Sequence, residues 1–231
     1  MESNTLSSLD NLDSLSEGIP WSPTRVCHLL YNLVLTFDRP EVVEIACCYG
    51  KATIYLAAAA KLRNGHLRSV DREEYYWKGS SVRDLLRKSD LLSTTKLDLK
   101  SDARWYLLKL LTRNRGMWID VAFLDLAHTV EIDSFASLAL WTHLKPGGIM
   151  VFDDIDWVPN IHQQSHEPVV HPDEKHVQVI FDYIGGMGDV YEKAYWGGKE
   201  VSWRWGFIRK KATLDTESIP LKVLLNRLDK Q

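Results

Sequence analysis

The sequence lacks the features that define several large classes of protein. Its 231 residues include only three cysteines, which show no C-x-x-C spacing, so neither a disulfide framework nor a cysteine-bound metal site is expected. No apolar run reaches the roughly 18–20 residues that a membrane-spanning helix needs. The formal net charge is −3, so no overall basic field points to a nucleic-acid or membrane partner.

The N-terminus also lacks the basic-then-apolar layout of a secretory signal. We interpret Cys27, Cys47 and Cys48 as small hydrophobic residues that stay reduced in the cytosol. A cytoplasmic protein is therefore expected. Hydrophobic residues make up 45% and charged residues 26% of the chain, which fits one globular α/β domain with a real core.

Two glycine signatures of phosphate-binding loops are missing as well. The chain has neither the G-x-G-x-x-G of dinucleotide-binding turns nor the G-x-x-x-x-G-K-[ST] of nucleotide-binding P-loops. Cofactors held through phosphates are therefore disfavoured, and a nicotinamide-dependent dehydrogenase is disfavoured with them.

What is present is an alternation of strand and helix patterns. A helix is predicted at 22–36, and apolar strands are predicted at 41–48, 67–71, 96–99, 118–126 and 149–155. Helical patterns follow these strands at 52–62, 77–92, 102–114, 131–144 and 173–184. Two late strands, 190–196 and 201–210, are joined by a hairpin loop at 197–200, and 145–148 is interpreted as a turn. The alternation predicts a doubly wound, Rossmann-like α/β fold with a seven-stranded, mostly parallel sheet and a C-terminal antiparallel hairpin.

A single folded domain is predicted at 19–211. Residues 1–18 are polar and aperiodic, and we interpret them as a mobile leader. Residues 212–231 form an amphipathic C-terminal extension. Both end segments are long enough to cross to a second subunit, so a homo-oligomer is compatible with the sequence.

The predicted carboxyl ends of the first three strands carry residues suited to a cofactor. Glu44–Gly50 has the spacing E-x-A-x-x-x-G, which places small residues where backbone must approach a ligand and opens a helix at Gly50. Asp71 ends the second strand, where a carboxylate accepts hydrogen bonds from vicinal ribose hydroxyls or caps the next helix. Ser101–Ala103 follows the third strand, where Asp102 is suited either to bind an adenine amino group or to cap a helix.

These segments, with Asp120–His128 and Leu144–Asp154, occur in the order found in class I S-adenosylmethionine-dependent methyltransferases, which the chain resembles over roughly Ser22 to Lys211. The stretch DVAFLDLAHTVEIDSFASLALWTHLKPGGIMVFDD is similar to a branch with a GG-x-x-x-x-DD motif. Many O-methyltransferases of sugars, macrolides and other secondary metabolites belong to that branch or lie near it. Family members usually have Gly where this chain has Ala46 and Leu126. The resemblance implies S-adenosylmethionine as the cofactor, bound by Glu44, Ala46, Tyr49, Gly50, Asp71, Ser101, Asp102, Ala103 and Asp125.

Acidic residues and a histidine follow the fourth and fifth predicted strands. Asp125 and one or both of Asp153 and Asp154 are expected to converge, because neighbouring strands lie about 4.8 Å apart. Three carboxylates suit Mg²⁺, or else Mn²⁺ or Ca²⁺, and metal-dependent relatives hold a substrate hydroxyl in this way. The alternative is one inward acid and one helix cap without metal. His128 is a candidate general base or, alternatively, a hydrogen-bonded loop histidine.

Other residues near these strand ends receive lesser roles. His162, His166, His171 and His176 have helical spacing, but Pro168 and Pro172 break it. We therefore interpret the region as a solvated lid, with one histidine able to touch substrate. Tyr49 and Trp157 are candidates for the pocket wall. Trp203 and Trp205 are expected on a half-buried strand with no catalytic role.

Together these observations predict an enzyme that transfers a methyl group from S-adenosylmethionine to a hydroxyl of a small polar metabolite. Divalent metal assistance is a secondary prediction, with Asp125, Asp153 and Asp154 as ligands and with Asp125, His128 and Asp154 as catalytic residues. Transfer to nitrogen or carbon, a cyclisation that uses the same cofactor, and a non-catalytic cofactor-binding module are the alternatives.

Overall fold

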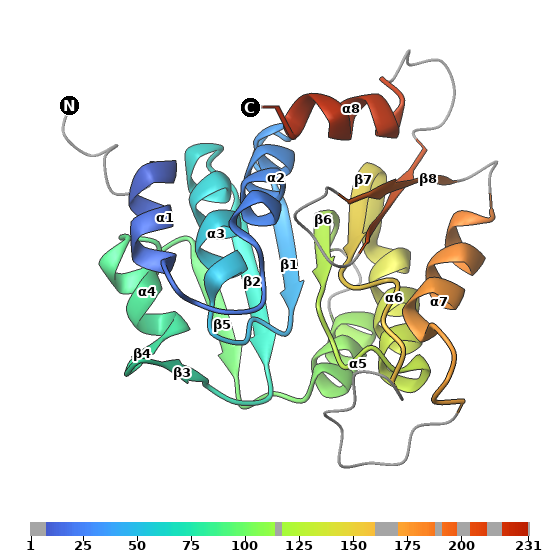
Figure 1. The fold of residues 1–231 in the computed structure, drawn as a ribbon, viewed down its shortest axis with the longest axis horizontal. Helices are drawn as coiled ribbons and strands as arrows, with labels where there is room; N and C mark the ends of the chain where they lie inside the picture. Colours follow the sequence, from blue (N-terminus) through green and yellow to red (C-terminus); the bar gives the residue numbers. More distant parts are fainter. Residues whose placement is uncertain are drawn as a thin grey trace. The chain divides into compact units, whose positions relative to one another are not determined.

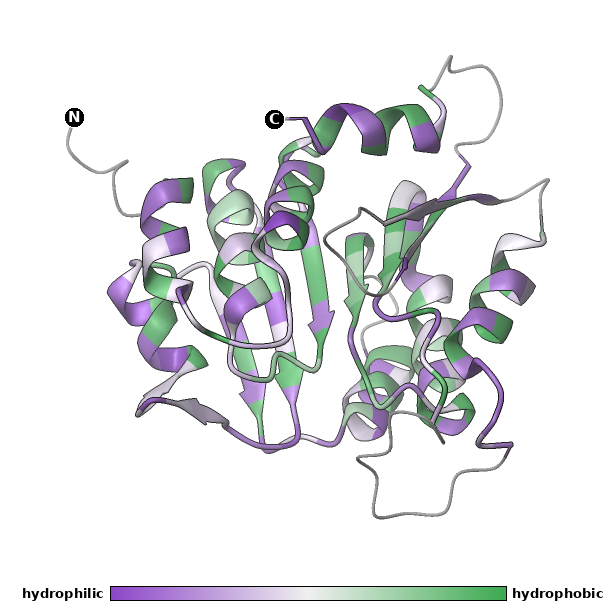
Figure 2. Cartoon of the chain, viewed as in Figure 1, coloured by the Kyte–Doolittle hydropathy of each residue, from purple (hydrophilic) through white to green (hydrophobic). Residues whose placement is uncertain are grey.

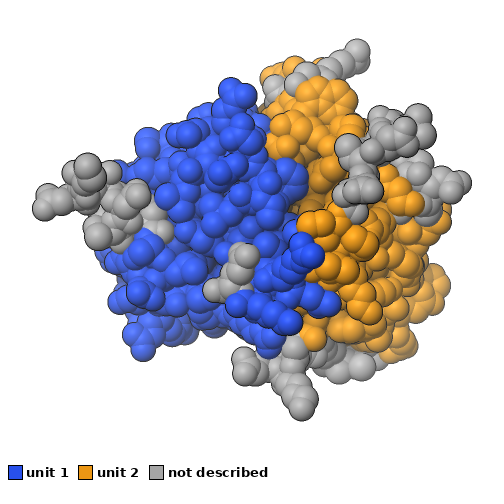
Figure 3. Space-filling view, turned by 90° about the horizontal axis from the view of Figure 1, so that it is seen from above, with its two compact units in different colours: residues 1–103, 224–231 blue, residues 104–223 orange. Residues whose placement is uncertain are grey.

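The computed structural model describes residues 8–113, 117–159, 171–187, 191–197, 204–211 and 219–230 (Figure 1). Seven strands form one mostly parallel sheet in the order β5-β2-β1-β6-β7-β9-β8, and β3 and β4 form a separate pair. The predicted Rossmann-like fold with a late antiparallel hairpin is confirmed. The chain divides into two compact units, residues 1–103 with 224–231 and residues 104–223 (Figure 3).

The first unit contains three parallel strands and the helices that pack on them. Its elements are α1 (Leu9–Ser16), α2 (Thr24–Leu35), β1 (Glu41–Ile45), α3 (Lys51–Leu62), β2 (His66–Asp71), β3 (Tyr76–Trp77), β4 (Ser80–Ser81), α4 (Val82–Lys88) and β5 (Thr95–Leu99). α3 packs against α2 as well as against β1 and β2. Its inner residues Ala57–Ala60 are fully buried, and such small side chains allow close packing on two sides. Figure 2 shows hydrophobic residues along β1, one of the strands on which α3 packs.

The prediction of a mobile leader at 1–18 is wrong for residues 9–16, which form α1. Leu12 is fully buried there. The Asp13 carboxylate accepts a hydrogen bond from the Tyr55 hydroxyl at 2.6 Å and lies 2.7 Å from His28 Nε2. The buried Leu12 and the Asp13 carboxylate thus attach a short helix whose apolar residues are Leu9, Leu12 and Leu15. Residues 1–7 lie outside the described part of the chain.

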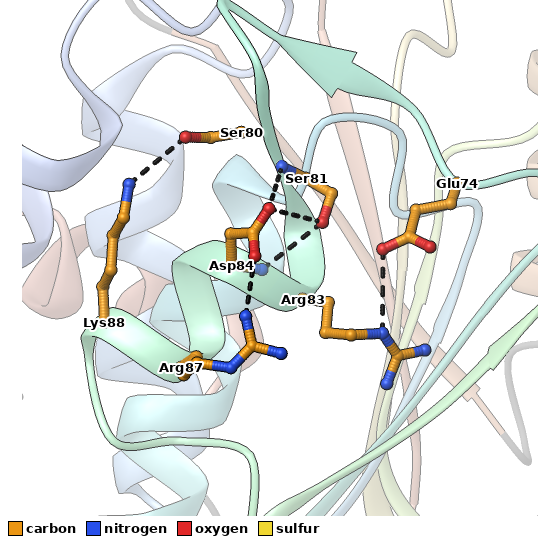
Figure 4. A network of polar contacts seen from close by, with 7 residues as sticks. All are labelled: Glu74, Ser80, Ser81, Arg83, Asp84, Arg87 and Lys88. Carbon is orange, nitrogen blue, oxygen red and sulfur yellow. Dashed lines mark hydrogen bonds and ion pairs between the residues drawn. The ribbon is translucent and has the colours of Figure 1, made fainter.

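The predicted helix at 77–92 is shorter than expected, because residues 76–81 form the β3–β4 hairpin. α4 begins at Val82, directly after a capping box in which Ser81 Oγ accepts from the Asp84 N–H and Asp84 Oδ2 accepts from the Ser81 N–H (Figure 4). This reciprocal pair satisfies the first backbone donors of the helix and fixes its start. Arg87 adds an ion pair to Asp84 at 2.7 Å.

The second unit contains β6 (Ile119–Leu124), α6 (Val130–His143), β7 (Leu144–Phe152), α7 (His176–Gly185), β8 (Tyr191–Trp196) and β9 (Trp205–Lys210), and most of α5 (Ala103–Arg113). β6 and β7 are parallel, whereas β9 runs antiparallel to both β7 and β8. Of the predicted hairpin loop, residues 198–200 lie outside the described residues.

The segment 145–148 is not the separate turn that the sequence predicted, since β7 begins at Leu144. The pairing of β6 with β7 shifts from Ile119↔Leu144 to Val121↔Ile149, so the Pro-Gly-Gly stretch forms an irregularity inside the strand. Lys145 Nζ donates to Asp120 Oδ2 at 2.7 Å across this irregularity. Beyond the irregularity, the two strands pair regularly from Val121↔Ile149 to Leu124↔Phe152. The two acids that end the GG-x-x-x-x-DD motif follow Phe152 directly.

The C-terminal extension forms α8 (Leu221–Leu228), whose Leu221, Leu225 and Leu228 are buried. In the first unit, Arg25 makes a two-point contact with Asp229, at 2.9 and 2.7 Å. Residues 212–218 of the extension lie outside the described part. Among the described residues, no helix is long and apolar enough to cross a membrane.

Candidate active site

The cofactor residues predicted in the first unit lie at one edge of its sheet. β1 and β2 pair up to Ile45↔Val70, and β2 and β5 pair up to Asp71↔Leu99. The turn after β1, Asp71 itself and the residues after β5 therefore follow the carboxyl ends of three adjacent parallel strands. That edge is where open α/β sheets bind ligands.

Asp71 joins these segments through hydrogen bonds. Its Oδ2 accepts from the Cys48 N–H and its Oδ1 from the Arg72 N–H, both at 2.8 Å, and its main-chain oxygen accepts from the Ser101 N–H at 3.1 Å. Burial raises the pKa of Asp71 above its ordinary value, while N–H groups of Cys48, Arg72 and Glu73 oppose that rise. The structure thus brings the turn at 46–50 to the Asp71 carboxylate and the start of the 101–103 segment to the Asp71 main-chain oxygen.

Ala46 has a backbone conformation that the sequence did not reveal. Its φ is +68°, in the left-handed region, and its N–H donates to the Val70 oxygen at 2.8 Å. A Cβ in this region costs roughly 1–2 kcal/mol, which explains why glycine is usual at this position in the resembled family. Leu126, the second departure from that pattern, is not among the residues with positive φ and carries no such cost.

We expect Ala46→Gly to stabilise the protein. Removing the Cβ relieves the left-handed strain, and the added freedom of glycine in the unfolded chain offsets about half of that gain, leaving about 0.5–1 kcal/mol. The thermal midpoint should rise by about 2 °C for a chain of this size. A lower midpoint for the variant would show that the methyl group contributes packing that outweighs the strain.

Gly50 stands directly before α3 with a φ of +84°. A Cβ at this position would lie 2.6 Å from Val82 Cγ2 and 2.9 Å from Val82 Cα. The turn therefore needs glycine twice, for its conformation and for the close approach of α4. Tyr49 packs against Tyr75 and Trp77, with ring centroids 6.1 and 5.6 Å apart, so its ring belongs to an aromatic cluster beside the turn.

Glu44 does not lie at an entrance to the site, as its place before the turn suggested. It is fully buried, and its Oε2 accepts hydrogen bonds from Thr53 Oγ1 at 2.8 Å and Ser69 Oγ at 2.6 Å. These contacts tie β1 to α3 and β2, so Glu44 supports the strand that carries the turn. Buried carboxylates need such hydrogen bonds to offset the loss of water.

The third predicted cofactor segment has mixed exposure. Ser101 is buried and held to Asp71 through its backbone. Asp102 is exposed and directly precedes α5, whose first residue is the half-buried Ala103. The position of Asp102 suits both predicted roles, an acceptor for a ligand and a cap for the helix.

In the second unit, Asp125, Asp153 and Asp154 gather after β6 and β7. Leu124 pairs with Phe152, and the Asp153 N–H donates to the Leu124 oxygen at 3.0 Å, so the residues that follow the two strands are neighbours. Asp154 has a φ of +46°, a bend that turns the chain out of the strand direction. Burial raises the pKa of Asp153 well above its ordinary value, and the charges of Asp125 and Asp154 raise it further.

His128 lies in the same cluster. Its Nε2 is 3.9 Å from Asp125 Oδ1, and its ring is 5.1 Å from the ring of Trp157. Burial lowers the pKa of His128 to about 4, so the ring is neutral near pH 7. The side chain is 12% exposed, and the backbone φ is +57°. His128 is thus a neutral, largely buried imidazole beside a carboxylate.

The metal prediction was tested on the geometry of the donors. Within the described ranges, no group of three or more His, Cys, Asp or Glu side chains is arranged to hold a metal ion. Asp125, Asp153 and Asp154 interact electrostatically, but they do not form a preorganised set of ligands. The described residues therefore do not fit the predicted metal site.

Sequence reasoning missed Asp133 in this cluster and placed His176 in a solvated lid, whereas each of the two residues is buried, at 4% exposed. Burial raises the pKa of Asp133 to about 7, with the charge of Asp125 as a further cause. His176 hydrogen-bonds the backbone at the start of α6 and so belongs to the protein interior. The predicted lid is not seen at His171 and His176, and the other two histidines lie outside the described residues. An aspartate within a helix pattern gives no sign in the sequence of its burial or of its raised pKa.

The aromatic predictions have mixed outcomes. Trp157 contacts His128, whereas Trp205 is buried and stacks on Phe123 at 5.5 Å. Trp203 lies outside the described residues. Trp205 is therefore more buried than the half-buried position that its alternating pattern predicted.

Comparisons with known proteins support the fold. Residues 43–155 match a family model described as a methyltransferase domain, and no curated protein matches the chain. The O-methyltransferase TomG from Streptomyces achromogenes, involved in tomaymycin synthesis and solved with SAM, is 15% identical over 92% of this chain and 91% of that chain, with a TM-score of 0.60. An O-methyltransferase from Bacillus cereus solved with SAH is 15% identical over 91% and 92%, with a TM-score of 0.57. The SAH-bound methyltransferase PaMTH1 from Podospora anserina is 14% identical over 91% and 88%, also with a TM-score of 0.57. The predicted resemblance is thereby confirmed: residues 43–155 are similar to a methyltransferase domain, and the chain has the fold of these solved methyltransferases.

Proposed function

We propose that this protein transfers a methyl group from S-adenosylmethionine to a hydroxyl of a small polar metabolite. One observation carries the proposal: the backbone N–H groups of Cys48 and Ser101 both donate hydrogen bonds to Asp71. All three residues lie in the segment that matches the methyltransferase model. Structural neighbours solved with SAM or SAH, two of them named O-methyltransferases, support the choice of cofactor and of oxygen as acceptor.

The residues of the first unit fit such a cofactor by their chemistry. The positive φ of Ala46 and Gly50 turns the backbone tightly at the end of β1, where an amino-acid tail would bind beside the start of α3. Asp71 is the carboxylate suited to ribose hydroxyls, since an ionised carboxylate has about four acceptor positions. Ser101–Ala103 would face the adenine.

S-adenosylmethionine, when bound, supplies a methyl group activated by a positively charged sulfur. The protein has to place the acceptor oxygen in line with that group and take up the hydroxyl proton. His128 suits the second task because its ring is neutral near pH 7. A weak base is sufficient here, since the oxygen becomes far more acidic as its bond to the methyl carbon forms. Asp125, 3.9 Å away, would stabilise the resulting imidazolium, and Asp154 would contact the acceptor.

The proposal is tested by calorimetry with S-adenosylhomocysteine. The wild-type protein should bind it, and Asp71→Ala should weaken binding by roughly 10–150-fold, because hydrogen bonds to a charged group contribute about 1.5–3 kcal/mol. Asp90→Ala is the matched control, since it removes an exposed carboxylate whose ion pair with Lys61 contributes little. Thermal melts without ligand show whether Asp71→Ala stays folded. Absence of binding by the wild type would refute the proposal.

The acceptor and the metal role are addressed by a transfer assay. Methyl-labelled S-adenosylmethionine is incubated with a panel of small hydroxylated, amino and carbon acceptors, and the product masses identify the methylated atom. Labelled O-methyl products support the proposal, whereas N- or C-methyl products favour the alternative enzymes. Binding without transfer to any acceptor favours a non-catalytic module. Metal assistance, which the described donors do not support, is tested in the same assay: activity that persists in EDTA would remove the ion from the mechanism.

A further inference from the structure

The loop after β6 carries Asp125 and His128, and its backbone is strained at His128. A non-glycine residue at the +57° φ of His128 costs about 1–2 kcal/mol, and strain of this kind persists only where surrounding contacts hold it. The loop leads directly into α6, whose first backbone N–H groups have no partner within the helix. Thr129 is the residue at the cap position, but its side chain makes no capping hydrogen bond.

The first of the two contacts that hold this loop comes from α6 itself. Asp133 Oδ2 accepts a hydrogen bond from the Thr129 N–H at 2.9 Å, and the carboxylate also accepts from the His128 N–H. The Asp133 N–H donates back to the Thr129 oxygen at 3.0 Å. Since Asp133 is 4% exposed, these bonds form in the protein interior, where they are stronger than in water.

The second contact comes from α7. His176 Nδ1 accepts a hydrogen bond from the Val130 N–H at 3.0 Å, and its Nε2 lies 2.8 Å from the His171 oxygen. Because a backbone N–H can only donate, Nδ1 must be the acceptor and Nε2 must carry the proton. The ring therefore has one tautomer, and both of its nitrogens are engaged by the backbone.

Asp133 and His176 together hold three consecutive N–H groups, those of residues 128, 129 and 130. The side chain of a serine, threonine or asparagine at the cap ordinarily accepts a hydrogen bond from the start of a helix, but the Thr129 side chain does not. Here two buried side chains, one of them from a different helix, replace the cap and reach back to His128. His128 in turn lies between Asp125 and Trp157.

We propose that His176, together with Asp133, is a positioning residue that holds His128 and Asp125 in the arrangement needed for methyl transfer. The inference rests on the proposed function. His176 contacts neither His128 nor Asp125 directly and acts through the Val130 backbone. Displacing a reacting group by about 1 Å can lower a rate about 100-fold, so loss of this hold should slow transfer without changing the chemistry.

Two substitutions separate the roles of the two ring nitrogens. His176→Asn keeps an amide oxygen near the position of Nδ1 and can still accept from Val130. His176→Gln places its amide near the position of Nε2, so it can still donate to His171 but leaves the Val130 N–H without its acceptor. The matched control is His143→Gln, which alters a buried histidine at the opposite end of α6, where Nδ1 contacts the Ala139 oxygen at 3.1 Å.

The first readout is amide hydrogen exchange followed by NMR, which needs no substrate. In His176→Gln, protection of the Val130 amide should fall about 10-fold or more, and the His128 resonances should shift. His176→Asn should retain protection within about threefold, and His143→Gln should leave residues 128–130 unchanged. Equal protection of Val130 in the wild type and in His176→Gln would overturn the positioning role.

The second readout is methyl transfer to the best acceptor from the panel assay. His176→Gln should lower kcat about 10–100-fold with KM for S-adenosylmethionine within threefold, and His176→Asn should restore most of kcat. An unchanged kcat in His176→Gln, with normal binding of S-adenosylhomocysteine, would overturn the inference while leaving the proposed function intact. Failure of the wild type to bind S-adenosylhomocysteine would instead overturn the proposed function, and the exchange result would still stand.

Discussion

Gly50→Ala should destabilise the protein by about 2–5 kcal/mol, the sum of about 1–2 kcal/mol for a Cβ in the left-handed region and about 1–3 kcal/mol for overpacking. The new Cβ would lie 2.6 Å from Val82 Cγ2 and 2.9 Å from a backbone atom of the same residue, so a side-chain rotation cannot relieve the contact. Urea unfolding of the two proteins measures the difference.

Gly79→Ala is the control that separates the two contributions. Gly79 has nearly the same φ, +81° against +84°, but nothing lies within 4 Å of its added Cβ. It should therefore lose only about 1–2 kcal/mol. Equal losses in the two variants would mean that α4 moves away from the turn without cost, and that Gly50 is required for its conformation alone.

Asp133→Asn should change the pH dependence of stability by about 3 kcal/mol between pH 5 and pH 8. The pKa of Asp133 is about 7 in the folded protein and about 4 in the unfolded chain. Between these values the folded state holds a proton that the unfolded state has lost, so the stability of the wild type falls as pH rises and levels off above about pH 7. Asparagine does not ionise and removes this contribution.

The measurement is urea unfolding of both proteins at pH 5, 6.5 and 8. Any cost of placing an amide at this position is the same at each pH and cancels in the comparison. The advantage of the wild type over the variant should shrink, or reverse, as pH rises. Parallel stability curves would show that the Asp133 carboxyl ionises in the folded protein much as it does in the unfolded chain.

The order of strands and helices could be predicted from the sequence because apolar runs and helix periodicity alternate clearly. The short hairpin before α4 could not be, since Trp77–Ser81 lies inside a pattern that also fits a helix. The start of α4 did have a signal, because Ser81 and Asp84 stand at the spacing of a capping box. α1 did have a signal, since Leu9, Leu12 and Leu15 recur every three residues, but the surrounding Ser, Asp and Asn made the segment resemble a polar leader.

The candidate site was predictable to the extent that it follows strand ends. Asp71, Asp125 and Asp153 could be placed because parallel strands end at a common edge. The burial of Glu44 and the left-handed backbone of Ala46 could not, since each depends on neighbours that only the folded chain supplies. Asp133 and His176 accept hydrogen bonds from the backbone of the loop before α6, which lies far from His176 in the sequence. Residue spacing alone does not predict such contacts.

The turn after β1 also gives the protein a chemical reporter of its own. None of its three cysteines is in a disulfide, but Cys27 and Cys47 are buried, and burial raises the pKa of the Cys47 thiol so that it stays protonated. Cys48 is the partly accessible one, and its backbone N–H is bonded to Asp71. A maleimide should therefore modify the native chain mainly at one sulfur, beside the carboxylate proposed to hold the ribose. The rate of that alkylation would follow occupancy of the turn without any knowledge of the methyl acceptor.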